Sequence, residues 1–81
     1  MAYFVYILKC SDETLYTGIA TDVDRRLTEH NTSVKGAKYT RVRRPVNLVY
    51  TEEVTDRSSA CKREHAIKKL KRKEKLELIN A

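Results

Sequence analysis

The chain has 81 residues, which suits one domain over residues 1–81 with a thin hydrophobic core. It carries 17 Lys and Arg against 11 Asp and Glu, and a formal net charge of +6 predicts a polyanionic partner. The apolar run at residues 2–8 is too short for a signal or a membrane span, and the two cysteines lack zinc or disulfide-framework spacing. We therefore expect a cytoplasmic protein with free buried thiols and no membrane association.

Two short strands open the chain. Residues 3–10 are nearly all apolar and rich in aromatic and β-branched side chains, which predicts a buried strand. Residues 11–13 form a turn, and residues 15–20 form the second strand. A three-residue loop joins them as an antiparallel hairpin and places Glu13 in a left-handed conformation where glycine is usual.

This hairpin register decides where the two motif tyrosines lie. It pairs Tyr6 with Gly18 and Leu8 with Tyr16, so that these four residues share one face of the sheet. Gly18 leaves space beside the Tyr6 ring. A slip of one residue would instead place the two tyrosines on opposite faces.

A helix follows, capped at residue 21 or 22 and running to about residue 31. Val23, Leu27 and His30 recur at i, i+4 and i+7, which is the spacing of an inward face. Arg26 lies beside that face. The remaining stretch to residue 44 is predicted to be a basic loop.

Three further elements complete the predicted fold. A strand over residues 46–51 has Val46, Leu48 and Tyr50 on one face, but the pattern does not fix the direction of this strand. A helix then runs to about residue 70, and the tail is helical as well. The helix carries an apolar stripe of Ala60, Cys61, Ala66, Ile67 and Leu70. The fold class is therefore α/β (α+β), a small three-stranded sheet covered by helices in the order β-β-α-β-α-α.

Positive charge is concentrated in two segments. Residues 30–51 hold five Lys and Arg and no Asp or Glu, and residues 62–75 hold eight Lys and Arg against two Glu. Such clusters indicate a surface that faces nucleic acid, and the alternative is an ordinary solvated surface.

The loop within the first segment interleaves an aromatic ring with cations. A segment of this kind can follow a phosphate backbone and stack on a base, whereas the alternative is a structured loop with its tyrosine packed inward. The candidate nucleic-acid-binding residues are Lys35, Lys38, Tyr39, Thr40, Arg41 and Arg43.

Glu64 lies on the flank of the apolar helical stripe, where a carboxylate pays a desolvation cost unless a cation or donor meets it. It pairs with a neighbouring Lys or Arg, lies exposed at the edge of the stripe, or serves as a metal ligand. Magnesium often takes one or two protein carboxylates and keeps waters and substrate phosphate, so a single Glu is sufficient.

Arg26 and His30 lie four residues apart on one helix face. Arg26 either forms an ion pair or holds a phosphodiester with its guanidinium fork. His30 is either a hydrogen-bonded histidine at the core edge or a residue that orients a tyrosine or relays a proton. By themselves, Tyr6 and Tyr16 would be core aromatics whose buried hydroxyls are hydrogen-bonded.

Together these residues resemble the GIY-YIG nuclease superfamily over essentially the whole chain, and more narrowly its small stand-alone single-domain bacterial members. The matching set is Tyr6, Tyr16-x-Gly18, Arg26-x-x-x-His30 and a later helical Glu64. The motifs are degenerate, because Phe4 stands where the family name implies Gly and Thr17 where it implies Ile.

The resemblance implies a role for each residue. Tyr6 would be the general base acting on water, with Tyr16 assisting it. Arg26 would grip the scissile phosphate, and Glu64 would hold one Mg²⁺ or Mn²⁺ ion. The family often has an Asn after the Glu, and Asn80 is the candidate here.

The function expected from this set is metal-dependent endonucleolytic hydrolysis of DNA phosphodiester bonds in repair or processing. We expect DNA rather than RNA as substrate, little sequence specificity, and a protein partner or a weak homodimer to support activity, because no added binding domain follows the module. Two alternatives remain open at this point, a nucleic-acid-binding module without turnover and a protein-interaction domain.

Overall fold

The computed structural model describes residues 2–33 and 35–81. Its centre is a three-stranded sheet of β1 (Tyr3–Lys9), β2 (Leu15–Ala20) and β3 (Asn47–Val54), in the order β2-β1-β3. β1 is antiparallel to both neighbours, which settles the direction of the third strand. The helices are α1 (Val23–Thr32), α2 (Lys38–Arg41), α3 (Arg57–Lys68) and α4 (Arg72–Ile79). This arrangement confirms the predicted fold class, with α2 as an additional short helix in the predicted loop.

The hairpin has the predicted register. Tyr6 faces Gly18 and Leu8 faces Tyr16 across the β1–β2 pair. The turn closes with the Cys10 N–H donating to the Thr14 carbonyl at 2.8 Å. Glu13 has a φ of 70°, the left-handed conformation expected of it.

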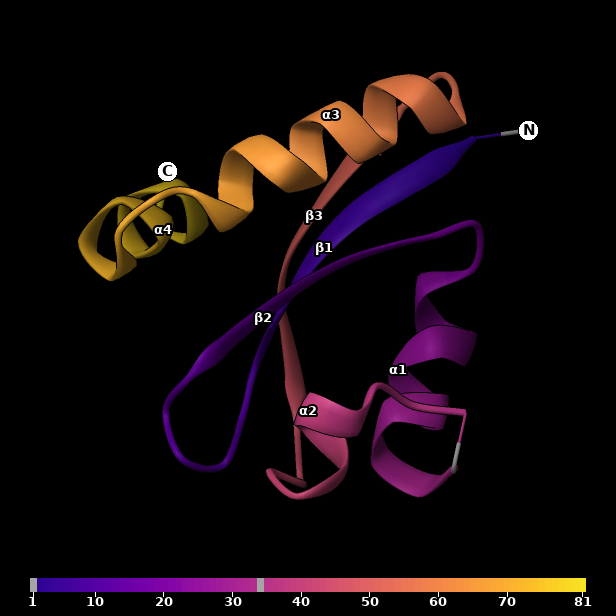
Figure 1. Cartoon of the computed structure of the whole chain (residues 1–81), viewed down its shortest axis with the longest axis vertical. Helices are drawn as coiled ribbons and strands as arrows, with labels where there is room; N and C mark the ends of the chain where they lie inside the picture. Colours follow the sequence, from indigo (N-terminus) through magenta and orange to yellow (C-terminus); the bar gives the residue numbers. More distant parts are fainter. Residues whose placement is uncertain (1, 34) are drawn as a thin grey trace.

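The two faces of the sheet bury different side chains. Val5 and Ile7 pack with Ala60 and Ile67 of α3. The alternate residues of β1 point the other way, and there Tyr6 and Leu8 pack with residues of α1. Figure 1 shows α3 and α4 on one side of the sheet and α1 and α2 on the other, with β2 running along the edge between them.

A bulge in β3 corrects one prediction. The register with β1 shifts between Ile7 and Leu8, so Ile7 faces Tyr50 while Leu8 faces Leu48. Val49 is the extra residue, and it packs together with Tyr50 on the α3 face. The prediction that Val46, Leu48 and Tyr50 share one face is therefore wrong for Tyr50.

The apolar stripe of α3 is narrower than predicted. Ala60 and Ile67 are buried, but Cys61 and Ala66 are exposed. Cys10 is buried on the α1 side, so the expectation of buried thiols holds for Cys10 and fails for Cys61. Within the described residues, no helix is long and apolar enough to cross a membrane.

Candidate active site

Gly18 makes room for the ring of Tyr6. A Cβ atom placed on Gly18 would lie 2.5 Å from the Tyr6 hydroxyl oxygen and 2.6 Å from its Cζ, both far inside van der Waals contact. The phenol therefore crosses β2 at the one position where the strand presents no side chain. This close approach is the physical reason for a glycine two residues after Tyr16.

The Tyr6 hydroxyl meets His30, which α1 projects onto the sheet. Tyr6 Oη and His30 Nε2 lie 2.8 Å apart, and His30 is fully buried. Burial, together with the charges of Arg26 and Arg44, lowers the pKa of His30 to about 4, so the imidazole is neutral at neutral pH. Burial, and after it Tyr16, raises the pKa of Tyr6 to about 12, so the phenol keeps its proton.

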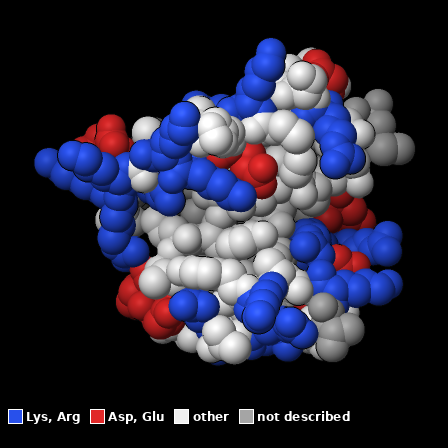
Figure 2. All heavy atoms as spheres, viewed as in Figure 1, with Lys and Arg blue, Asp and Glu red and all other residues white. Residues whose placement is uncertain are grey.

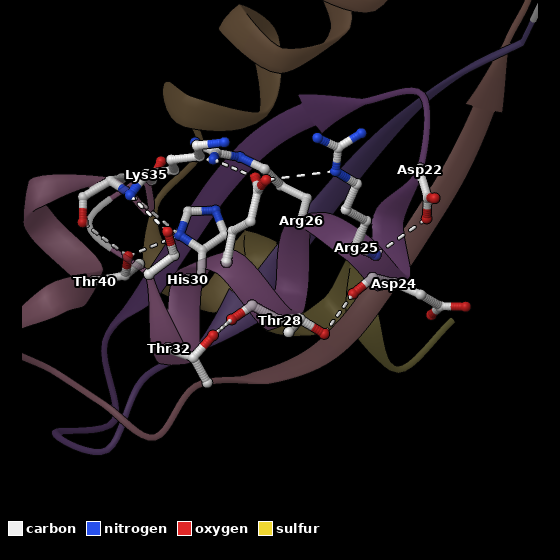
Figure 3. A network of polar contacts seen from close by, with 12 residues as sticks. Asp22, Asp24, Arg25, Arg26, Thr28, His30, Thr32, Lys35 and Thr40 are labelled. Atoms are coloured by element: carbon white, nitrogen blue, oxygen red, sulfur yellow. Dashed lines mark hydrogen bonds and ion pairs between the residues drawn. The ribbon is translucent and has the colours of Figure 1, made fainter.

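Arg26 is the fixed cation of the site. Its guanidinium donates to Glu29 Oε1 at 3.0 Å and to the Lys35 carbonyl at 2.8 Å. Figure 3 shows it on the same helix as His30, one turn away. Its hydrogen bonding and charge act to lower the pKa of Tyr6 against the larger effect of burial. Arg26 therefore favours negative charge on the phenol oxygen.

Tyr16 contacts the same histidine from β2. Its ring lies edge-on to His30 with 5.2 Å between centroids, and it stacks with Tyr39 at 5.9 Å. The Arg43 guanidinium covers the Tyr39 ring at 3.9 Å from the centroid. Tyr39 is 38% exposed, yet its stacking partners are already supplied by this chain. The Tyr39 ring is therefore already stacked by groups of this chain.

Glu64 lies on α3, on a different element from the other candidate site residues. Its side chain is 23% exposed, and its recorded ion pair is a 3.7 Å contact with Lys68 on the same helix. The carboxylate lies near enough to Tyr6 for its charge to raise the pKa of that phenol, although it is the smallest of the causes named for Tyr6. Glu64 thus retains oxygen atoms that a cation could bind.

Glu64 offers a single carboxylate as a possible metal ligand. Among residues 2–33 and 35–81, no group of three or more His, Cys, Asp or Glu side chains could hold a metal. A zinc centre needs such a group, whereas magnesium is commonly held by one or two carboxylates with waters and phosphate oxygens. A single half-buried carboxylate fits the second case.

The basic loop separates into two kinds of residue. Arg43 forms an ion pair with Asp12 at 3.0 Å and donates to the Tyr39 carbonyl at 2.9 Å. Arg44 donates to the carbonyls of His30 and Ser33, each at 2.6 Å, and so caps the end of α1. These two arginines hold the fold together, which sequence patterns did not reveal because their partners are backbone carbonyls and a distant Asp.

Lys35, Lys38 and Arg41 are exposed, and they form no ion pair with any residue that the structure describes. Figure 2 shows a hollowed, largely uncharged band across one face of the molecule, with Lys and Arg side chains on both sides of it. The exposed loop cations are thus available to a polyanion, whereas Arg43 and Arg44 are already engaged.

Two predicted site residues are not placed as expected. Thr40 is fully buried, so its side chain is unavailable to nucleic acid. Asn80 follows α4 and lines a pocket of about 280 Å³ with Lys9 and Leu15, on the α3 side of the sheet. The structure therefore brings together Tyr6, Tyr16, Arg26 and His30, with Glu64 in electrostatic range, and does not add Asn80 to that group.

One partner in the site was missed from the sequence. Glu29 anchors Arg26 at 3.0 Å and is itself shielded, with 20% of its side chain exposed. The i, i+3 spacing of these two residues on a predicted helix is the signal that could have found the contact. The pKa of Glu29 is lowered, first by its hydrogen bond from Arg26, so it stays ionised and holds the guanidinium in place.

Comparison with known proteins defines the class of the protein. The family model of the GIY-YIG catalytic domain matches residues 2–77. The chain therefore belongs to the GIY-YIG family, the superfamily of nucleases that the sequence motifs indicated.

Similar proteins narrow the assignment within this family to the UPF0213 proteins. A UPF0213 protein of Desulfotalea psychrophila is 61% identical over 80 residues, covering 99% of this chain and 73% of that protein. A UPF0213 protein of Staphylococcus epidermidis is 56% identical over 77 residues, covering 95% and 93%. The solution structure of a UPF0213 protein from Bacillus halodurans is 46% identical, with a TM-score of 0.63, and the match covers 99% of this chain and 84% of that one. A protein of E. faecalis is also 46% identical, with the same coverage and a TM-score of 0.67.

Proposed function

We propose that this protein is a metal-dependent endonuclease that hydrolyses DNA phosphodiester bonds with little sequence specificity. The observation that carries the proposal is the convergence of three groups on one phenol. His30 bonds the Tyr6 hydroxyl at 2.8 Å, while Arg26 and Glu64 both act on its pKa. A base, a cation and a carboxylate around one site are the parts that phosphoryl transfer by water requires.

In the hydrolytic step, Tyr6 takes a proton from the attacking water and passes its own proton to His30 Nε2. The water oxygen forms a bond to phosphorus, the bond to the leaving oxygen breaks, and that oxygen takes a proton from solvent. Arg26 stabilises the charge that develops on the phosphoryl oxygens. Because Arg26 helps to lower the pKa of His30, a phosphate that neutralises Arg26 would make His30 a better proton acceptor.

Glu64 is the residue that would hold one Mg²⁺ or Mn²⁺ ion. Such an ion supplies Lewis-acid polarisation of the phosphate and stabilises the leaving oxygen. Side chains of the protein would bind and orient the substrate. A groove of about 230 Å³ between the end of β2 and α1 is lined by Arg25, Arg26 and Glu29, and it would give a phosphate access to the Arg26 side chain.

Affinity for the substrate comes from exposed cations rather than from base contacts. Lys35, Lys38 and Arg41 would meet phosphates, which gives salt-sensitive and largely sequence-independent binding. DNA remains the preferred substrate over RNA in this proposal, as the family resemblance implies.

The test is cleavage of single-stranded, duplex, flapped and branched DNA, with RNA alongside, in magnesium, manganese or chelator. Glu64→Gln should lower the metal-dependent rate by about 100-fold or more, because it removes the anionic ligand while keeping the shape. Glu74→Gln is the matched control, since Glu74 is an exposed glutamate whose side chain accepts from the Lys71 N–H at 2.9 Å on α4.

If Glu64→Gln cleaved as fast as the unmodified protein, the metal site proposed here would be wrong. Binding without cleavage in every condition would instead identify a nucleic-acid-binding module on the same basic surface. In that case Tyr6 and His30 would be structural residues.

A further inference from the structure

The side chain of Thr40 points into the protein, whereas Lys38 and Arg41 on the same helix are exposed. α2 is a single turn, Lys38–Arg41, and Thr40 is its buried residue. Thr40 Oγ1 lies 2.7 Å from His30 Nδ1, and Figure 3 shows the two side by side. The other ring nitrogen of His30 is the one that meets Tyr6 at 2.8 Å. Thr40 and Tyr6 therefore contact opposite ends of one buried imidazole.

Counting hydrogens assigns the tautomer of that imidazole. Thr40 Oγ1 donates to the Ala37 carbonyl at 2.9 Å, and a carbonyl has no hydrogen to give. The single hydroxyl hydrogen of Thr40 is used there, so the contact with His30 needs a hydrogen on Nδ1. Nε2 is then without a hydrogen, and the contact with Tyr6 uses the phenol hydrogen.

The other tautomer satisfies these groups less well. With the hydrogen on Nε2, the Thr40 hydroxyl would turn to Nδ1 and lose its 2.9 Å bond to Ala37. What this tautomer would gain is a longer hydrogen bond, from the Ala37 N–H to the bare Nδ1 at 3.4 Å. The Tyr6 hydroxyl hydrogen would also have no acceptor among the residues that the structure describes, because its recorded hydrogen bond is the one to His30.

We infer that Thr40 is a positioning residue that holds His30 in the tautomer with its hydrogen on Nδ1. This tautomer leaves Nε2 free to accept the Tyr6 proton. The Tyr6 proton can pass to His30 only if the nitrogen that faces it carries no hydrogen. The catalytic role of this tautomer therefore rests on the proposed function. Thr40 touches neither substrate nor metal in this arrangement, and it acts through His30.

The first experiment reads the tautomer directly. In ¹⁵N-labelled protein at neutral pH, long-range ¹H–¹⁵N correlation of the imidazole distinguishes a hydrogen-bearing nitrogen from a bare one. We expect His30 to show hydrogen-bearing Nδ1 and bare Nε2. A hydrogen on Nε2, or rapid averaging of the two forms, would overturn the inference whether or not the protein cleaves DNA. The NMR result therefore tests this inference independently of the proposed function.

The second experiment uses three threonine variants. Thr40→Val keeps the shape but removes the hydroxyl, Thr40→Ser keeps the hydroxyl, and Thr17→Val is the matched control. Thr17 is buried on the α3 face, and its hydroxyl has no partner among the described residues. Thr40→Val should shift the imidazole nitrogens toward averaging, while Thr40→Ser and Thr17→Val keep the unmodified pattern.

The same variants give a kinetic reading in single-turnover cleavage. Thr40→Val should slow the step by about 10- to 100-fold, the usual cost of losing a residue that orients a working histidine. Thr40→Ser should restore it to within about threefold, and Thr17→Val should leave it unchanged. Equal rates in Thr40→Val and the unmodified protein would overturn the positioning role. If Thr40→Val does not fold, the tautomer of the unmodified protein and the Thr40→Ser rate still decide the question.

Discussion

The two faces of the sheet are built from the same strand but bury different kinds of side chain. On the α3 face, Val5 and Ile7 bury apolar side chains against Ala60 and Ile67. Tyr6 lies between Val5 and Ile7 in the sequence, but its side chain is on the α1 face and meets a buried histidine. Both faces bury apolar side chains, and the α1 face adds a chain of buried hydrogen bonds through His30.

This difference has an energetic consequence. Apolar contacts are non-directional, so the α3 face tolerates small shifts in geometry. The α1 face buries His30 and Thr40 completely, and a buried polar group costs about 1–3 kcal/mol when its partner is lost. A small domain has little stability to spare, so such a network is costly to keep for structure alone. We therefore expect substitutions in the apolar core of the α3 face to change stability, and those in the hydrogen-bonded network of the α1 face to change chemistry.

The largest expected effect contrasts two tyrosines, one on each face. Tyr6→Phe removes the hydroxyl that bonds His30, and it should lower the cleavage rate by about 10²- to 10⁴-fold. Tyr50→Phe removes a hydroxyl that donates to Glu52 at 2.6 Å on the α3 face. It should cost about 1 kcal/mol of unfolding free energy and leave the rate unchanged.

The measurements are cleavage rates and urea unfolding of both variants. The rates are compared under conditions where unfolding shows each variant to be fully folded. A rate loss of similar size in both would mean that the two faces are not functionally distinct.

The next effect concerns two histidines and the pH dependence of stability. Burial and the nearby cations lower the pKa of His30 to about 4, below its ordinary value of 6.5. Between these values the unfolded chain binds a proton that the folded protein does not, so stability falls as the pH falls. The expected loss between pH 7 and pH 5 is about 2 kcal/mol. Paired carboxylates such as Glu29 have lowered pKa values and add their losses at lower pH.

Urea midpoints measured across this range, with His30→Gln and His65→Gln in parallel, check the assignment. His65 is exposed on α3, so its replacement should keep the slope, whereas His30→Gln should flatten it. A slope that survived in His30→Gln would assign the titration to another group.

The contrast between the faces also explains what the sequence could predict. The hairpin register and the α1 face followed from alternation and helical spacing, because Tyr6, Leu8, Tyr16 and His30 lie on regular elements. The placement of Tyr50 was missed because a bulge adds one residue and reverses the alternation after it. No propensity marks that position.

The role of Thr40 was missed for a different reason. It lies in a cation-rich segment, and local composition predicted a surface loop. Its burial depends on Arg43 and Arg44, which tie the segment to Asp12 and to the end of α1. These are long-range contacts with no periodic signal. Local sequence pattern therefore does not distinguish a buried threonine from an exposed lysine in this segment.

The smallest effect tests whether the exposed cations of α2 face the substrate. Lys38→Ala with Arg41→Ala should reduce the slope of log affinity against log salt by about 1.4 to 1.8, since each lost phosphate contact removes about 0.7–0.9. The matched control is Arg57→Ala with Lys62→Ala, which removes the same charge from α3. Lys62 lines a groove with Glu52 and Val54 of β3, at the sheet edge opposite β2. The control should weaken binding slightly through net charge and keep the slope.

Fluorescence anisotropy with labelled DNA, in a Glu64→Gln background that prevents cleavage, supplies the slopes. Equal changes of slope in the two double variants would mean that the substrate binds the whole basic surface without preference. A larger change in the α3 pair would move the interface to the β3 edge, away from Tyr6. A change confined to the α2 pair would put the substrate against the helix that carries Thr40 on its inner side. The charges that bind DNA and the hydroxyl that orients His30 would then lie on one turn of chain.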